Sequence, residues 1–331
     1  MRIAYCTPGL GPCGGLRVIF EHVNGLVDRG HDVFIVNDGP NTPSWYGELK
    51  APVVSLHVWL KTAAPVDVVV ATGFSTAYWA HLVKGSRYYY FIQMMEHFFL
   101  SSGSQGHISA IESYSYAHKK GFTLLTIADW LGRELAAEHG VPGVPIIPNG
   151  VNKDHFYRES SRKDVPRYIM FEGDNRNPAK DTEGIAWRVG TELRDKFNVE
   201  LWGYAAYRHS FSDKMNKLIL VPSYSEMRNL YTDALFLLKA SHWEGRACAP
   251  VEAMCCGTPT VRGILQGDDD LRNGYNCLRS SYSYEAVLHN ATCMLNDVKL
   301  RNQLSRNCLR YAKKHLEWEP IIERLEGIYA R

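Results

Sequence analysis

Short apolar runs alternate with segments of helical period along this chain, and they do so in two separate series. The first series predicts strands at 2–6, 32–36, 66–71, 88–93, 123–127 and 144–147. The second series predicts strands at 168–172, 199–202, 218–221, 234–238 and 258–261. Between the first two runs, apolar residues repeat at helical spacing and stop at Gly30, which predicts a βαβ unit. Each series is therefore expected to form a doubly wound, Rossmann-like α/β domain.

A polar segment at 148–166 separates the two series and has the composition of turns and linkers. A chain of 331 residues is long enough to bury two cores. We expect one domain at 1–152 and a second at 153–314. The rest of the chain, 315–331, is expected to be helical, with Ile321, Leu325 and Ile328 on one face behind Pro320.

Charge and cysteine usage exclude several kinds of partner. The formal net charge is +2 and no long basic run occurs, so we expect no nucleic-acid partner. The eight cysteines show no spacing typical of zinc sites or disulfide scaffolds, which indicates reduced thiols in a cytoplasmic protein without an export leader. No apolar stretch approaches the roughly 20 residues that cross a bilayer, so any membrane contact is expected to be peripheral, at the inner face.

The first predicted strand is followed by a glycine-rich loop that contains Gly9, Gly11, Gly14 and Gly15. Backbone amides at such a loop, with a helix start behind them, can bind a phosphate group. The letters also fit the G-x-G-x-x-G pattern, and Asp38 stands where a ribose-binding acid would follow, so an NAD-dependent oxidoreductase is one alternative. Against that alternative, Pro12 stiffens the loop and its glycines come late after the strand. A plain connecting turn is the third alternative.

Two glutamates with seven residues between them, Glu244 and Glu252, mark the second half of the chain. The residues after Glu244 are expected to form a loop, Pro250 fits a first helical turn, and the helix is expected to close at Gly257. Backbone amides at this helix start can hold a diphosphate while Glu252 reaches ribose hydroxyls. The donor-binding candidates in this segment are Arg246, Ala247, Cys248, Ala249 and Glu252.

This segment, Glu-Gly-x-x-x-x-x-x-Glu-Ala-Met-x-x-Gly-x-Pro-x-Val, resembles the signature of the retaining glycosyltransferases of family 4. The resemblance implies that Glu244 lies beside the donor sugar and that Glu252 binds the ribose. The non-functional alternative is a pair of surface carboxylates around a helix start. The sequence departs from the family consensus at Arg246, Ala247 and Cys248, so the sugar pocket is expected to differ. Arg246 either meets an anionic substrate or is a solvated arginine at a loop edge.

Arg176 and Lys180 follow the strand at 168–172, in a segment that resembles the one where the family places cations against the donor diphosphate. Breaking a glycosidic bond to a diphosphate builds negative charge on the leaving oxygen, and fixed cations lower that barrier. The resemblance therefore assigns Arg176, Lys180 and Glu244 to catalysis. A solvated charged loop is the alternative.

Polar residues end the predicted strand at 88–93 and continue beyond it, and the candidates for the acceptor side are Gln93, Glu96 and His97. This stretch resembles the Phe-Val-Gln-x-x-Glu segment of a bacterial subset of the family that includes rhamnosyltransferases, which implies a role in polysaccharide synthesis. His97 lies close to where relatives carry a sugar-contacting histidine. A histidine beside aromatic residues is, however, more often a packed, hydrogen-bonded one.

The likeness continues at Asn149-Gly-Val-Asn152 and in the terminal helix, so it spans nearly the whole chain. It implies the GT-B fold, with two domains facing across a cleft and a final helix that returns to the first domain. It also implies a UDP-, GDP- or dTDP-sugar donor, a glycan, lipid-linked or natural-product acceptor, and no required metal or other cofactor. Asp268 to Asp270 are interpreted as a solvated turn. A non-catalytic nucleotide-sugar-binding protein remains an alternative.

Overall fold

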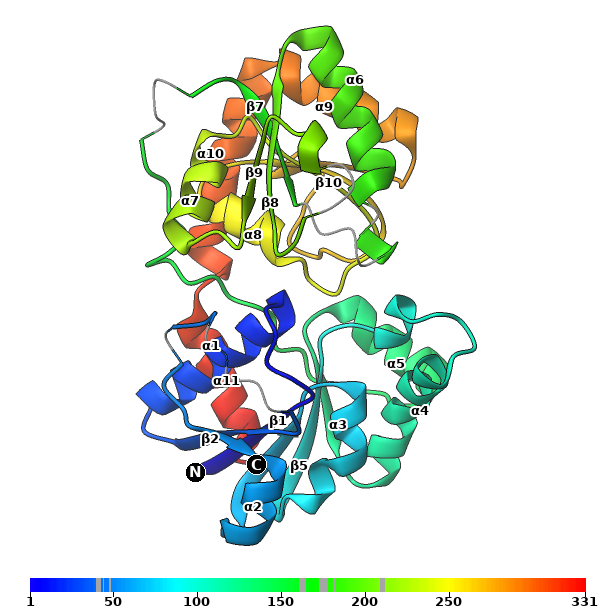
Figure 1. The fold of residues 1–331 in the computed structure, drawn as a ribbon, viewed down its shortest axis with the longest axis vertical. Helices are drawn as coiled ribbons and strands as arrows, with labels where there is room; N and C mark the ends of the chain where they lie inside the picture. Colours follow the sequence, from blue (N-terminus) through cyan, green and yellow to red (C-terminus); the bar gives the residue numbers. More distant parts are fainter. Residues whose placement is uncertain are drawn as a thin grey trace. The chain divides into compact units, whose positions relative to one another are not determined.

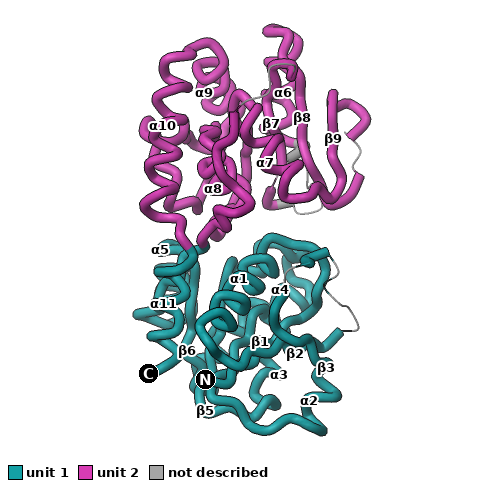
Figure 2. Tube along the Cα trace, turned by 90° about the vertical axis from the view of Figure 1, so that its left-hand side faces the viewer, with its two compact units in different colours: residues 1–149, 318–331 teal, residues 150–317 magenta. Residues whose placement is uncertain are grey.

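The two series of apolar runs form two separate parallel sheets in the computed structural model. The structure describes residues 1–39, 43, 45–47, 49–160, 165–172, 178–180, 182–208 and 212–331. The chain divides into unit 1, made of Met1–Asn149 with Trp318–Arg331, and unit 2, made of Gly150–Glu317 (Figure 2). Each unit consists of one sheet and the helices that pack against it. The predicted α/β fold of two doubly wound halves is confirmed.

Unit 1 has the strand order β3-β2-β1-β4-β5-β6, with all neighbouring pairs parallel. Its strands are β1 (Arg2–Thr7), β2 (Asp32–Asn37), β3 (Val53–Ser55), β4 (Val66–Ala71), β5 (Gly85–Ile92) and β6 (Thr123–Thr126). Its helices are α1 (Gly14–Asp28), α2 (Leu56–Thr62), α3 (Phe74–Trp79), α4 (Gln105–Lys119), α5 (Asp129–His139) and α11 (Trp318–Tyr329). The strand order reverses between β1 and β4, at the centre of the sheet.

Unit 2 has the order β12-β11-β10-β7-β8-β9, again with parallel pairs. Its strands are β7 (Tyr168–Glu172), β8 (Glu200–Ala205), β9 (Lys217–Leu220), β10 (Leu237–Trp243), β11 (Thr260–Gln266) and β12 (Cys277–Ser280). Its helices are α6 (Trp187–Phe197), α7 (Tyr224–Asp233), α8 (Cys248–Cys255), α9 (Tyr284–Asn296) and α10 (Val298–His315). The order reverses between β10 and β7, the first strand of this unit.

Several strand predictions differ from the structure for local reasons. The short edge strands β3 and β12 were not predicted, because three or four residues are too few to show a period. Strand β10 was predicted to end at residue 238 but continues to Trp243 through polar residues. The run at 144–147 forms only an isolated bridge between Thr126 and Ile146, since Pro145 has no N–H for a ladder.

The terminal helix α11 belongs to unit 1, as predicted, and lies beside α1 (Figure 1). It buries Ile321 and Leu325 against this unit. Its last residue, Tyr329, is fully buried and its hydroxyl lies 3.0 Å from that of Tyr5. Ile322 fits against Gly25, where an added Cβ would come within 2.7 Å of its side chain. Within the described part of the chain, no helix is both long and apolar enough to cross a bilayer.

A fully buried histidine, His22, lies in α1 and contacts Phe91 and Trp318 edge-on or at a tilt. Neither ring nitrogen has a hydrogen-bond partner among the described residues. Burial lowers the pKa of His22 to about 3. Below about pH 6.5 the unfolded chain binds a proton at His22 but the folded chain does not. The stability that the neutral imidazole contributes is therefore complete above pH 6.5 and is lost as pH falls toward 3.

We expect His22→Leu to flatten the pH dependence of stability on the acid side. Between pH 7 and pH 5, His22 should cost the wild-type chain about 2 kcal/mol of unfolding free energy that the variant does not lose. Urea unfolding at the two pH values measures this difference. His57→Leu, at an exposed histidine of α2, is the control. Equal losses in the wild type and in His22→Leu would contradict the assignment.

Candidate functional site

The candidate site lies at the carboxyl edge of the unit 2 sheet, where the strand order reverses between β10 and β7. Glu172 ends β7, and Lys180 follows in the 3-10 turn Pro178–Lys180. Ser241 lies near the end of β10, and Glu244 comes directly after that strand. Reversal points of this kind are where open α/β sheets bind ligands, because the loops of two neighbouring strands diverge there.

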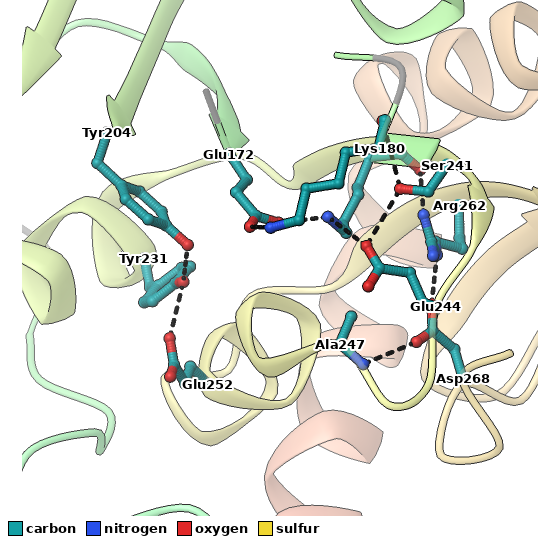
Figure 3. Close-up of polar contacts among 11 residues, drawn as sticks. Glu172, Lys180, Tyr204, Tyr231, Ser241, Glu244, Ala247, Glu252, Arg262 and Asp268 are labelled. Atoms are coloured by element: carbon teal, nitrogen blue, oxygen red, sulfur yellow. Dashed lines mark hydrogen bonds and ion pairs between the residues drawn. The ribbon is translucent and has the colours of Figure 1, made fainter. Parts of the chain in front are cut away.

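The structure brings Lys180 and Glu244 into one polar cluster, together with Glu172 and Lys239 (Figure 3). Lys180 Nζ lies 2.5 Å from Glu172 Oε1, and Lys239 Nζ bonds to the other oxygen of Glu172. Lys239 Nζ also lies 2.9 Å from Glu244 Oε1. Ser241 Oγ can donate to Glu244 Oε1 at 3.3 Å. Lys180 and Glu244, which were predicted to share a site, are thus connected through Glu172 and Lys239, which were not predicted.

Charged partners keep the members of this cluster ionised. Burial alone would raise the pKa of the Glu172 carboxyl, but Lys180 and Lys239 outweigh it and hold that pKa well below its usual range. Burial alone would lower the pKa of Lys180, but Glu172 and Glu244 together raise it above its usual range. Both groups are therefore charged at neutral pH.

The backbone of Glu244 is fixed by the end of β11. Its N–H donates to Gln266 O at 3.2 Å. Gly267 has a φ of +120°, and a Cβ there would lie 2.0 Å from the carbonyl oxygen of Glu244. A glycine is therefore needed at 267 both for the backbone conformation and for the close approach of the two loops.

Helix α8 starts at Cys248, earlier than predicted, and ends before Gly257, whose φ is +77°. Pro250 lies in its first turn, as expected. The predicted donor-binding residues Ala247, Cys248 and Ala249 surround this start, but the N–H of Ala247 donates to Asp268 Oδ1 at 3.0 Å. Ala247, the N-cap of the helix, follows Glu244 by three residues, and the helix start lies next to the Glu244 cluster (Figure 3).

Glu252 is a buried residue of α8, exposed by only 4%. The hydroxyl of Tyr231 donates to Glu252 Oε2 at 3.0 Å, and the hydroxyl of Tyr204 lies 3.1 Å from that of Tyr231 (Figure 3). Two tyrosines from α7 and β8 thus orient this carboxylate. The alternative of surface carboxylates around a helix start does not apply to Glu252.

The interpretation of Asp268 to Asp270 as a solvated turn is wrong, because Asp268 and Asp270 are buried ion-pair partners. Arg262 Nε lies 2.5 Å from Asp268 Oδ2. Arg246 Nη2 donates to Asp270 Oδ1 at 2.6 Å, and the hydroxyl of Tyr311 donates to the same oxygen. Arg246 is accordingly buried against Asp270 and is not the solvated arginine of the alternative. Among the described residues, no three His, Cys, Asp or Glu side chains are placed to hold a metal ion.

In unit 1, the glycine-rich loop lies beside the end of β5. Helix α1 starts at Gly14, with Cys13 as its N-cap, and Gln93 Nε2 donates to Gly15 O at 3.0 Å. An added Cβ at Gly9 or Gly11 would meet nothing within 4 Å. Gln93 and Gly15, which were separate candidates for the acceptor side and the phosphate loop, are thus in contact.

Glu96 and His97 follow β5 in the turn Glu96–Phe99. The N–H of Phe74 donates to Glu96 Oε1 at 2.9 Å. Burial of its carboxyl group raises the pKa of Glu96 to about 7 despite this hydrogen bond. His97 packs against Phe98 and His107, and burial followed by repulsion from neighbouring histidines lowers its pKa to about 4. A carboxyl that titrates near neutrality at a strand end is typical of functional sites.

Arg176, the second predicted cation, lies outside the described residues. Lys239 and Glu172 were missed, although each had a sequence signal. Lys239 interrupts the apolar run of β10, and Glu172 ends the apolar run of β7. A charged residue within a buried strand requires a partner of opposite charge, so Lys239 could have been predicted to form a buried ion pair.

The fold over the whole chain is that of GT-B glycosyltransferases. Sucrose-phosphate synthase from Thermosynechococcus elongatus is 13% identical, with a TM-score of 0.78 over 99% of this chain and 98% of that one. HepE from Anabaena, solved with UDP and glucose, is 14% identical, with a TM-score of 0.78 over 100% and 99%. WaaG, a glycosyltransferase involved in lipopolysaccharide biosynthesis, is 15% identical, with a TM-score of 0.77 over 99% of both chains. No protein-family model and no curated protein sequence matches the chain.

Proposed function

We propose that this chain transfers a sugar from a nucleoside diphosphate donor to an acceptor with retention of the anomeric configuration. The observation that carries the proposal is the cluster of Lys180 and Glu244 beside the start of α8, at the strand reversal of a GT-B fold. A cation, a helix start and a carboxylate at one sheet edge match a diphosphate with a sugar attached to it.

In this proposal, unit 2 binds the donor. Lys180, with Arg176, neutralises the diphosphate as the bond from its oxygen to the anomeric carbon breaks. The backbone at Arg246, Cys248 and Ala249 borders the phosphates, and the buried Glu252, oriented by Tyr231, accepts from the ribose hydroxyls. Glu244, held by Lys239, contacts the sugar. Lys180 and Arg176 neutralise the diphosphate charge that a metal ion would otherwise neutralise.

Unit 1 is assigned the acceptor, a glycan, lipid-linked or natural-product hydroxyl compound. Gln93 holds the start of α1 at Gly15, while Glu96 and His97 offer polar groups at the beginning of the turn Glu96–Phe99. Retention places the incoming hydroxyl on the face that the diphosphate leaves, and a donor phosphate oxygen accepts its proton. The polar strand end resembling rhamnosyltransferases favours polysaccharide synthesis as the setting.

Thermal unfolding with UDP, GDP, dTDP and NAD tests the proposal. We expect one nucleoside diphosphate to raise the Tm by several degrees, since saturation at 100 times Kd adds about 2.7 kcal/mol. Its sugar conjugate should release free nucleoside diphosphate on incubation. Lys180→Met should lose the Tm shift, whereas Lys196→Met, at an exposed lysine of α6, should keep it.

The two alternatives predict other results. A shift with NAD and none with any diphosphate would favour the oxidoreductase. Binding of a nucleoside diphosphate sugar without release of the diphosphate, with a broad panel of glycan acceptors present, would favour a non-catalytic binding protein. Either result would reject the transferase.

A further inference from the structure

Four charged side chains form an alternating row at the candidate site, here called the charge row: Lys180, Glu172, Lys239 and Glu244. Each oxygen of Glu172 takes one lysine, Oε1 from Lys180 and Oε2 from Lys239. Lys239 bridges Glu172 and Glu244. The two positive and two negative side chains of the row cancel.

The two lysines of the charge row differ in how firmly they are held. Lys239 lies within strand β10, with a side chain 5% exposed and two carboxylate partners. Lys180 lies in a short 3-10 turn, with a side chain 24% exposed and Glu172 as its ion-pair partner. Lys180 is thus the more exposed of the two lysines and stands at one end of the row, where it can exchange its partner for an incoming anion.

Lys180 is also the described cation that the proposed function assigns to the donor diphosphate. A lysine ammonium is a compact charge with rotatable donors, so Lys180 can turn from one anion to another. A diphosphate that approaches Lys180 must therefore compete with the Glu172 carboxylate, which is already bonded to it.

We propose that Glu172 is an internal anion that competes with the donor diphosphate for Lys180, and that Lys239 retains Glu172 when Lys180 turns to the phosphate. This inference rests on the proposed function. Glu172 lowers the affinity for nucleoside diphosphate, which helps the spent diphosphate to leave after transfer. Lys239 keeps the buried Glu172 carboxylate in an ion pair during the exchange.

Isothermal titration of the full chain with inorganic pyrophosphate, and with the nucleoside diphosphate that raises the Tm, tests this role. We expect Glu172→Gln to bind pyrophosphate about tenfold more tightly, because one competing negative charge is removed a few ångströms from the anion. Lys239→Met should bind it about tenfold more weakly, because Glu172 then loses one of the lysines that hold it and competes more strongly for Lys180. Glu192→Gln, at a carboxylate of α6 paired with Lys196, is the matched control and should not change the affinity.

The opposite signs separate this role from a structural one, since damage to packing weakens binding in both variants. Glu172→Asp draws the carboxylate back from Lys180 and keeps its charge, so a smaller tightening is expected even if Glu172→Gln does not fold. Unchanged or weaker pyrophosphate binding by a folded Glu172 variant would overturn the inference while leaving the proposed function intact. A wild-type chain that binds neither pyrophosphate nor any nucleoside diphosphate would reject both.

Discussion

Glu244→Gln should lower turnover of the sugar donor by about a hundredfold or more while the chain still binds nucleoside diphosphate. The carboxylate of Glu244 is fixed by Lys239 and Ser241, and its backbone is held by Gln266. The amide keeps the shape of the side chain and removes the charge. An interaction made with the sugar in the transition state should appear in kcat and leave diphosphate affinity unimpaired.

Release of nucleoside diphosphate from the sugar donor, measured beside titration with the diphosphate alone, separates the two effects. Glu285→Gln, at an exposed residue of α9, is the control and should keep full turnover. Wild-type turnover by Glu244→Gln would remove Glu244 from catalysis. Loss of diphosphate binding together with turnover would instead assign Glu244 to the integrity of the site.

Asp268→Ala should destabilise unit 2 by about 3 to 5 kcal/mol, the cost of leaving a buried charge without its partner. Arg262 is fully buried, and Asp268 holds its guanidinium. The other oxygen of Asp268 accepts from the N–H of Ala247, so the start of α8 loses a support as well. Asp268→Asn keeps an acceptor for one of the two donors and should cost less.

Urea unfolding at pH 7 checks this ranking. Asp213→Ala is the matched control, because Asp213 pairs with Arg208 on the surface and exposed pairs contribute about 1 kcal/mol or less. If Asp268→Ala and Asp213→Ala lost the same stability, the ion pair of Arg262 and Asp268 would not support the loop. Equal losses in the alanine and asparagine variants would show that the negative charge of Asp268, and not its hydrogen bonds, is the dominant contribution.

The fold was largely predictable because parallel strands buried on both faces read as apolar runs, such as Val66–Ala71. The same signal fails at the edges of the sheets. Strand β12, with the sequence Cys-Leu-Arg-Ser, is too short and polar to be distinguished from a loop. The return of α11 to unit 1 was predicted from the family resemblance, because the apolar face of the helix does not by itself identify the surface that it covers.

The candidate site was predictable only in part. The spacing of Glu244 and Glu252 and the position of Lys180 were read from the sequence, and the structure joins Lys180 to Glu244 through Glu172 and Lys239. Spacing could not show the pairing itself, which depends on β7 and β10 being neighbours. Asp268 was misread for the same reason: the acidic run looks solvated until the fold sets Arg262 against it.

The last helix has a consequence for biosynthesis. Because α11 completes the core of unit 1, a nascent chain has all the strands of that unit long before it has the helix that covers them. Translation of the intervening 150–317 segment takes on the order of ten seconds, during which Tyr5 and Tyr89 lack their contacts with α11. Unit 2, which is continuous in the chain, can finish folding on the ribosome before the half that was made first.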